Sequence, residues 1–225
     1  MTTMPLEMMK NQTQRIKSFL LSKVNRILAL SELREIFKDA QFDTKLEVIL
    51  GKQTILFTDI VGSSDFYNHV GDAQAFVQVR NHFQEIFKEI HTKNGVVVKT
   101  IGDSVMASFK SPDDAIAAAI KIQERFHHER EDTCIRLRIA IHSGPVIAVQ
   151  LKTGIDFFGH TVNYAAKIQT SGGAGEVVLS DIVHTSYQQN TKSDFKVEKR
   201  TKQGADGASE EIFVVRVSAP KQLAA

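Results

Sequence analysis

The chain has 225 residues, of which 42% are hydrophobic and 24% charged, and its formal net charge is +2. This balance is typical of a globular protein and excludes a global polyanion-binding field, so we expect no nucleic-acid partner and only a local site for any nucleotide. The single cysteine, Cys134, excludes an intramolecular disulfide and a cysteine-based zinc site. No apolar run approaches 18 residues and the N-terminus lacks a signal-peptide core, so we expect a cytoplasmic chain without a membrane span.

Residues 1–50 differ from the rest of the chain and are expected to form a helical extension. Apolar residues recur at helical spacing between Ile16 and Leu30, and a second short helix is expected from Ser31 to about Ala40. The extension has too little mass for a domain. It could pack on the main domain, lead into a dimer as a coiled coil, or connect to an upstream regulatory domain or partner.

From residue 51 the chain alternates strand and helix patterns up to residue 217, and residues 218–225 are expected to be a tail. The first half predicts a strand at 54–59 and a helix at 64–91 that is broken near Gly71. A hairpin with strands at 96–100 and 104–109, a helix at 111–126 and a strand at 135–141 follow. This order is the ferredoxin-like βαββαβ arrangement. We therefore expect an α+β sandwich with an antiparallel-rich sheet and helices on one face.

The second half predicts further strands around one helix. A bend at His142–Pro145 is expected to separate the strand 135–141 from a possible strand 146–151. A helix at 161–169 and a loop at 171–175 follow. The remaining pattern predicts extra C-terminal strands at 177–179, 195–197 and 212–217, with a flexible loop at 202–208.

A turn after the first strand combines an acid, a glycine and two serines. Asp59 directly follows the apolar run from Thr54, and a buried strand interior would not keep an unpaired carboxylate. Gly62 permits a tight turn, and Ser63 or Ser64 could cap the following helix. Such a turn could bind a phosphate through its N–H groups while Asp59 holds a cation. The alternative is an Asx turn and a helix cap without chemistry.

A second acid, Asp103, stands in the predicted hairpin turn after Gly102. The ferredoxin-like order can place this turn beside the end of the first strand. Asp59 and Asp103 would then hold one or two divalent ions against a triphosphate, and their hard oxygen ligands suit Mg²⁺. Alone, Asp103 could equally be an ordinary turn residue.

Four segments of the chain, in order, resemble the class III adenylate/guanylate cyclase catalytic domain, and the resemblance covers about residues 54–217. They are Phe57-Thr-Asp-Ile-Val-Gly-Ser-Ser64, Lys99-Thr-Ile-Gly-Asp-Ser-Val-Met106, Arg138-Ile-Ala-Ile-His-Ser-Gly144 and Asp156-Phe-Phe-Gly-His-Thr-Val-Asn-Tyr-Ala-Ala-Lys167. The resemblance implies a cyclase sandwich fold and the conversion of a nucleoside triphosphate to its 3′,5′-cyclic monophosphate and pyrophosphate.

The resemblance also implies roles for individual residues. Asp59 and Asp103 match the metal-binding aspartates, with the Ile60 carbonyl as an additional ligand, for two Mg²⁺ or Mn²⁺ ions per site. The backbone of Gly62, Ser63 and Ser64 matches the triphosphate cradle, and Arg138 matches a phosphate-binding arginine. The purine-selecting pair is matched by Lys99 and Asp156, the ribose-orienting residue by Asn163 and the transition-state arginine by Lys167.

The purine is expected to be adenine. Adenine presents an acceptor at N1 and a donor at N6, which a Lys99 donor and an Asp156 acceptor complement, whereas guanine reverses this pattern. Family members that select guanine typically carry an acid at the position of Lys99. The chain is therefore expected to be an adenylate cyclase, with guanylate cyclase as the weaker alternative.

Lys167 departs from the family's arginine, because its point charge lacks the planar fork of a guanidinium. This departure favours, as the main rival, a non-catalytic or weakly active nucleotide-binding module. Members of the family work as head-to-tail dimers with metal residues from one chain and purine residues from the other. Since this chain carries both sets, the resemblance implies a homodimer with two equivalent sites.

Overall fold

The computed structural model describes residues 48–128, 135–151, 154–190, 196–203 and 209–217. The expected N-terminal helices, Cys134 and the C-terminal tail lie outside these residues. Contacts divide the chain into a large unit, Lys52–Val146 with Phe157–Ala225, and a small unit that includes Ile147–Asp156 and residues up to Gly51. Each unit is described by itself. None of the helices in the described part of the chain is long and apolar enough to cross a membrane.

The first half of the chain has the predicted βαββαβ order. Its elements are β1 (Val48–Ile60), α3 (Ser63–Val70), α4 (Asp72–Thr92), β2 (Val96–Ile101), β3 (Ser104–Phe109), α5 (Pro112–His128) and β4 (Leu137–Leu151). The break between α3 and α4 falls at Gly71, whose φ of 80° is readily adopted only by glycine. The ferredoxin-like prediction is confirmed.

The second half is richer in structure than the sequence suggested. Its elements are β5 (Gly154–Phe158), α6 (His160–Gln169), β6 (Glu176–Ser180), α7 (Asp181–Asn190), β7 (Val197–Gln203) and β8 (Ser209–Arg216). β5 and α7 were not predicted, and β7 extends into the loop expected at 202–208. Polar residues dominate both α7 and β7, so neither segment carries a strong apolar pattern.

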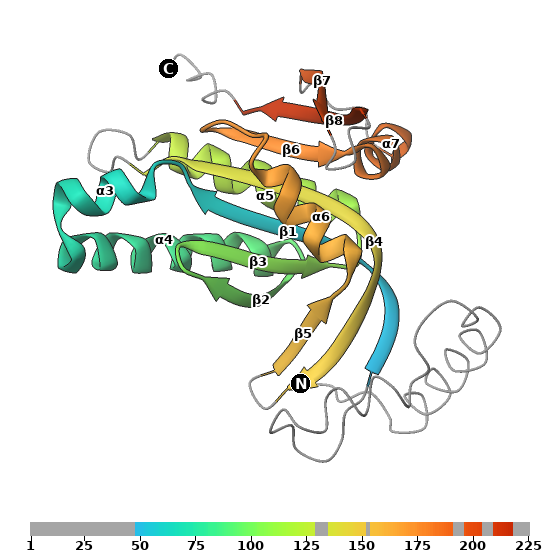
Figure 1. The fold of residues 1–225 in the computed structure, drawn as a ribbon, viewed down its shortest axis with the longest axis horizontal. Coiled ribbons are helices and arrows are strands. Elements are labelled where there is room, and N and C mark those ends of the chain that lie inside the picture. Colours follow the sequence, from blue (N-terminus) through green and yellow to red (C-terminus); the bar gives the residue numbers. More distant parts are fainter. Residues whose placement is uncertain (1–47, 129–134, 152–153, 191–195, 204–208, 218–225) are drawn as a thin grey trace, which may run out of the picture. The chain divides into compact units, whose positions relative to one another are not determined.

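The strands form one sheet in the order β2-β3-β1-β4-β6-β8-β7, with β5 paired to β4 (Figure 1). β3 runs antiparallel to both β1 and β2, and β8 runs antiparallel to both β6 and β7. β4 and β6 run parallel. The end of β1, which carries Asp59, is therefore a neighbour of the start of β3, which directly follows Asp103.

Alternate residues of the central strands pack on opposite faces of the sheet. In β1, Leu56 joins a core with residues of α3, α4, α5 and α7, whereas Ile55 and Phe57 join a second cluster that includes Ala165 of α6. Burial of one such side chain contributes about 1.5–3 kcal/mol. Helix α6 is thus the exception to the expected single helical face: it covers the other side of the sheet (Figure 1).

The bend predicted at His142–Pro145 is wrong, because β4 continues through it as one strand. Gly144 serves close packing instead of a turn. A Cβ atom at Gly144 would lie 2.5 Å from Thr161 Oγ1, and the Thr161 hydroxyl donates a hydrogen bond to the Pro145 carbonyl at 2.6 Å. The absence of a side chain at Gly144 lets the first turn of α6 lie directly on β4.

Gly144→Ala should lower the free energy of unfolding by about 1–3 kcal/mol, because the added methyl group pushes α6 away from β4. The matched control is Gly51→Ala, where a Cβ atom meets nothing within 4 Å. Urea unfolding followed by circular dichroism measures both changes. Equal stability of the two variants would contradict the proposed packing role.

Candidate active site

The Asp59 carboxylate lies near the end of β1 and binds groups from both neighbouring strands. Arg138 of β4 donates from Nε to Asp59 Oδ2 at 2.7 Å, and its Nη2 lies 2.5 Å from the same oxygen. The Ser104 hydroxyl at the start of β3 donates to Asp59 Oδ1 at 2.8 Å. The register that pairs Thr58 with Val105 brings Ser104 to this position. The carboxylate is therefore oriented through both of its oxygens.

Asp103 lies beside this group, in the turn between β2 and β3. The turn depends on Gly102, whose φ is 60°, although a Cβ atom there would meet nothing within 4 Å. Asp103 Oδ2 is buried and has no hydrogen-bond partner among the described residues. A buried carboxylate oxygen without a donor is costly, so this atom calls for a cation or a donor that the chain does not supply.

A pocket of about 380 Å³ joins the Asp103 turn to the start of α3. It is lined by Ser63, Ser64, Tyr67, Asn68, Gly102 and Asp103. The expectation that Ser63 or Ser64 caps α3 is wrong, because the N-cap is Gly62, in the left-handed region with φ 76°, and no side chain caps the helix. Gly62 turns the chain so sharply that both serines fall within the first turn. The first N–H groups of a helix have no intrahelical acceptors, which suits an anion at this end.

The chemistry of this cluster fits a divalent cation. Asp59 and Asp103 provide two negative charges and hard oxygen ligands, while Arg138 provides one positive charge within the cluster. Ile60 is the last residue of β1, and its side chain is buried, so its backbone belongs to the rigid end of the strand. The orphaned Asp103 oxygen is the observation that most directly favours a bound cation.

The two predicted purine-selecting residues lie in different units: Lys99 in the large unit and Asp156 in the small unit. Lys99 lies in β2, next to an irregularity in its pairing with β3, and its Nζ is 5.8 Å from the ring centroid of Phe158. Asp156 lies in β5 and its side chain is buried. The pairing of Lys99 with Asp156 therefore stays a prediction.

Asn163 and Lys167 lie one turn apart on α6. Asn163 is exposed and Lys167 half-buried, while Ala165 and Ile168 face the core. Lys167 Nζ lies 3.7 Å from Glu210 Oε1 on β8. The two residues thus share the outer face of α6, as predicted from their spacing, but Lys167 already has an acidic neighbour.

Two further side chains accompany the Lys167–Glu210 pair. The Lys202 ammonium of β7 donates to the Lys167 carbonyl at 2.7 Å, and burial together with the positive charge of Lys167 lowers the pKa of Lys202. Burial and the negative charge of Glu210 raise the pKa of Tyr164. The end of α6 therefore carries two lysines around one carboxylate, an arrangement with an excess of positive charge.

Sequence analysis missed Ser104, Lys202 and Glu210. Ser104 directly follows Asp103, so its place at the start of a strand opposite Asp59 could have been read from the hairpin. Lys202 and Glu210 are cross-strand partners in the β7–β8 hairpin. Their opposite charges were a weak signal, because such pairs are common on exposed hairpins.

His142 is a partly buried titratable group within the same β4 segment as Arg138. Burial, reinforced by the positive charge of His160, lowers the pKa of His142 to about 4. Its Nδ1 lies 2.8 Å from Ser180 Oγ, and its ring lies against Tyr164 with centroids 4.6 Å apart. His142 is therefore neutral near pH 7 and links β4 to β6 and α6.

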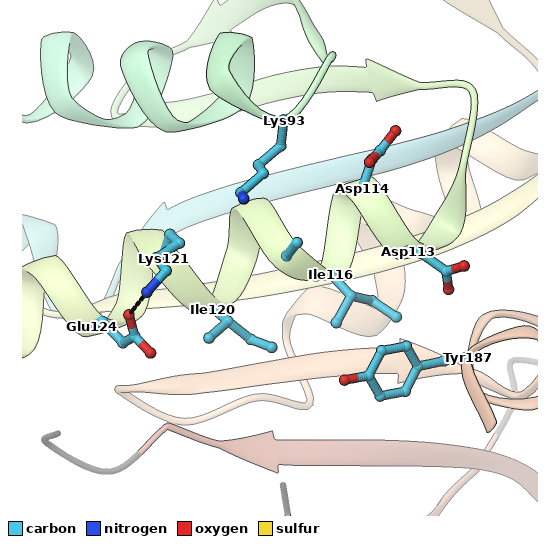
Figure 2. Close-up of a pocket in the computed structure, with 9 residues that line it drawn as sticks. Lys93, Asp113, Asp114, Ile116, Ile120, Lys121, Glu124 and Tyr187 are labelled. Carbon is cyan, nitrogen blue, oxygen red and sulfur yellow. Dashed lines mark hydrogen bonds and ion pairs between the residues drawn. The ribbon is translucent and has the colours of Figure 1, made fainter. Parts of the chain in front are cut away.

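A larger pocket, of about 430 Å³, lies along α5 between Lys93 and Tyr187 (Figure 2). Two of its charged residues, Lys121 and Glu124, pair with each other at 2.6 Å. Its lining contains none of the residues predicted for the site. Three of the predicted metal and phosphate residues, Ser63, Ser64 and Asp103, line the smaller pocket instead.

Residues 50–216 of the chain match the adenylate and guanylate cyclase catalytic domain. The chain belongs to this family. It is 25% identical over 207 residues to the receptor-type adenylate cyclase GRESAG 4.2 of Trypanosoma brucei brucei. This match covers 74% of this chain and 36% of that protein. It is 29% identical over 162 residues to the germination-specific adenylate cyclase of Dictyostelium discoideum, which covers 65% of this chain and 18% of that protein.

Among solved structures, the chain resembles the catalytic core of a rhodopsin-guanylyl cyclase with converted specificity in complex with ATPαS. The TM-score is 0.67 at 21% identity, and the match covers 76% of this chain and 99% of that one. This likeness confirms the cyclase fold. The chain spans about a third or less of the length of the two curated relatives, so the similarity concerns only part of each.

The Asp59–Arg138 pair should show strong energetic coupling. In a double-mutant cycle of Asp59→Asn and Arg138→Met, we expect a coupling energy of about 1–3 kcal/mol, because each single variant leaves a partly buried charge unpaired. The Lys121–Glu124 pair, with exposed fractions of 53% and 27%, is the control and should couple by less than about 1 kcal/mol. Urea unfolding of all variants gives both energies, and equal coupling in the two pairs would contradict the geometry.

Proposed function

We propose that the chain is an adenylate cyclase, which converts ATP to 3′,5′-cyclic AMP and pyrophosphate. The observation that carries this proposal is the pocket that joins Asp103 to the start of α3, next to Asp59, which accepts a hydrogen bond from Ser104 directly after Asp103, in a chain of the cyclase family. Paired carboxylates next to exposed helix N–H groups are what a metal-bound triphosphate requires.

In the proposed mechanism the ribose 3′-hydroxyl loses its proton to solvent water as its oxygen attacks the α-phosphorus in line, and pyrophosphate leaves with the electrons of the broken P–O bond. Asp59, Asp103 and the Ile60 carbonyl would hold two Mg²⁺ or Mn²⁺ ions, which when bound lower the charge cost at both reacting oxygens. The N–H groups of Ser63 and Ser64 bind the triphosphate. Such fixed donors stabilise the developing charge without reorganisation.

The adenine edge is proposed to be read by Lys99 and Asp156, and the ribose to be oriented by Asn163. The cation–π contact with Phe158 supports a defined position for the Lys99 ammonium, and burial restricts the Asp156 carboxylate. A lysine donor toward N1 and a carboxylate acceptor toward N6 complement adenine and not guanine. Guanylate cyclase is the alternative that this pairing disfavours.

A complete site is proposed to need two copies of the chain. Asp59 contacts residues of β3 and β4, whereas Lys167 contacts residues of the β7–β8 hairpin, so each copy carries two separate sets. A head-to-tail homodimer would join the sets into two equivalent sites. We propose residues 51–217 as the catalytic domain, residues 1–50 as a connector to a regulatory partner, and the cytoplasm as the location.

A second candidate function is a nucleotide-binding module with little or no catalysis. The observation that favours it is the contact of Lys167 with Glu210, because a lysine held by an acid is a weaker stabiliser of phosphate charge than a guanidinium fork. Turnover separates the two candidates.

The first test is turnover with each nucleotide. Cyclic AMP formation from ATP with Mg²⁺ or Mn²⁺ should exceed cyclic GMP formation from GTP, and Lys99→Glu with Asp156→Cys should reduce that preference. Asp59→Asn should abolish turnover, whereas Asp72→Asn, an exposed acid at the start of α4, should leave it unchanged. Faster turnover of GTP, or an active Asp59→Asn variant, would contradict the proposal.

The second test concerns Lys167. Lys167→Arg should raise kcat about ten- to a hundredfold with little change in KM, because a guanidinium fork adds a contact made mainly in the transition state. Lys167→Ala should lower kcat. The matched control is Lys199→Ala, an exposed lysine of β7 that pairs with Glu211 at 2.7 Å and should change neither constant.

Steady-state assays at saturating ATP and Mn²⁺ compare the four proteins. Equal rates for wild type and both Lys167 variants would show that Lys167 does not touch the reacting phosphate. If wild type and Lys167→Arg both bind ATP without turnover, the nucleotide-binding module is the better account.

A further inference from the structure

The carboxylate proposed as a metal ligand is already bound to a cation of the same chain. Both Nε and Nη2 of Arg138 lie on Asp59 Oδ2, at 2.7 and 2.5 Å, and Ser104 donates to Oδ1. These are charge-assisted contacts of a partly buried pair, with exposed side-chain fractions of 28% for Arg138 and 16% for Asp59. A metal ion that approaches Asp59 therefore meets an occupied oxygen.

We propose that Arg138 is an internal counter-ion that occupies the cation position on Asp59 until metal and triphosphate together displace it. Metal binding and phosphate binding are then coupled through one side chain, because the guanidinium released from Asp59 becomes the donor to the phosphate. This inference rests on the proposed function, in which Asp59 holds a metal ion.

The electrostatics of the cluster require the exchange. A divalent ion on Asp59 Oδ2 and a guanidinium on the same atom are like charges within a few ångströms, and they repel strongly where the surroundings are partly buried. Once Arg138 leaves, its guanidinium needs an anion of its own, since an unpaired charge in a partly buried place is costly. The triphosphate is the anion that arrives with the metal.

The surrounding structure allows the side chain to move while its backbone stays fixed. Arg138 lies in β4 directly before Ile139, which pairs with Val177 of β6, so the strand is held in the sheet. The Arg138 side chain is 28% exposed, so neighbouring residues do not enclose it completely. Ser104 keeps its hydrogen bond to Oδ1, and the carboxylate therefore stays oriented while Oδ2 changes partner.

The two acids of the cluster differ in a way that fits this exchange. Asp59 is neutralised by Arg138, whereas Asp103 Oδ2 is buried without a partner. A first cation could bind at Asp103 without competition, but an ion shared by both carboxylates must compete with Arg138. Removal of the guanidinium should therefore strengthen metal binding in the absence of nucleotide, whereas removal of an arginine that contacts only the phosphate would leave that binding unchanged.

The test measures Mn²⁺ binding to the nucleotide-free, full-length chain by electron paramagnetic resonance of free Mn²⁺. Arg138→Met should bind Mn²⁺ about tenfold more tightly than wild type, the factor expected from the loss of one competing charge-assisted contact. Arg138→Lys keeps the charge but loses the fork, so its affinity should fall between those two. Arg136→Met, an exposed arginine at the entrance to β4, is the control for general electrostatics and should match wild type.

Affinity in Arg138→Met equal to or weaker than that of wild type would overturn the proposal, and so would an equal gain in Arg136→Met. If Arg138→Met does not fold, Arg138→Lys alone decides: tighter binding supports the proposal and unchanged binding overturns it. Asp59→Asn in the Arg138→Met background separates the metal site from the counter-ion role. If the double variant binds Mn²⁺ as tightly as Arg138→Met alone, Asp59 holds no metal and the metal site itself is wrong; if Arg138→Met gains no affinity while Asp103→Asn loses Mn²⁺ binding, only the counter-ion role fails.

Discussion

Two carboxylates gathered at one end of a sheet repel each other, and the whole site depends on how that repulsion is balanced. The antiparallel pairing of β1 with β3 fixes Asp59 next to the Asp103 turn, despite the repulsion between the two carboxylates. Arg138 comes from the strand on the other side of β1 and neutralises one of the two acids. The order of the strands therefore brings the two acids together and also places Arg138 where it offsets part of their negative charge.

The opposite charge is balanced in a similar way at the end of α6. Lys167 and Lys202 would repel each other, and the carboxylate of Glu210 on β8 offsets their charges. In the proposed site, Arg138 lies where a metal ion would bind Asp59, and Glu210 lies beside Lys167, which is proposed to contact a phosphate. On that proposal each half of the site carries an internal counter-ion, and ligand binding exchanges one charged partner for another.

The part of the fold that came from strong local patterns could be predicted. The apolar run before Asp59, the break at Gly71 and the turn at Gly102 each have one dominant physical cause, so the βαββαβ half was correct. Gly144 was misread because a glycine before proline usually marks a turn, whereas here it makes room for Thr161. Only the tertiary packing of α6 on β4 distinguishes the two cases.

Side chains that depend on long-range pairing were beyond the sequence. Ser104 and Glu210 act through partners 45 and 43 residues away, and nothing in their local pattern marks them. Motif resemblance supplied Asp59, Asp103 and Arg138, but not the contact between Asp59 and Arg138. An ion pair between strands becomes visible only when the side chains are placed in three dimensions.

The central claim is that one catalytic site combines the Asp59 cluster of one copy with α6 of another. Mixing inactive Asp59→Asn chains with inactive Asn163→Ala chains tests it most directly, because one of the two sites in a mixed dimer is then intact. The account predicts that cyclic AMP formation returns on mixing, in proportion to the mixed dimers counted by native mass spectrometry. Mixed dimers without any recovered activity would contradict it.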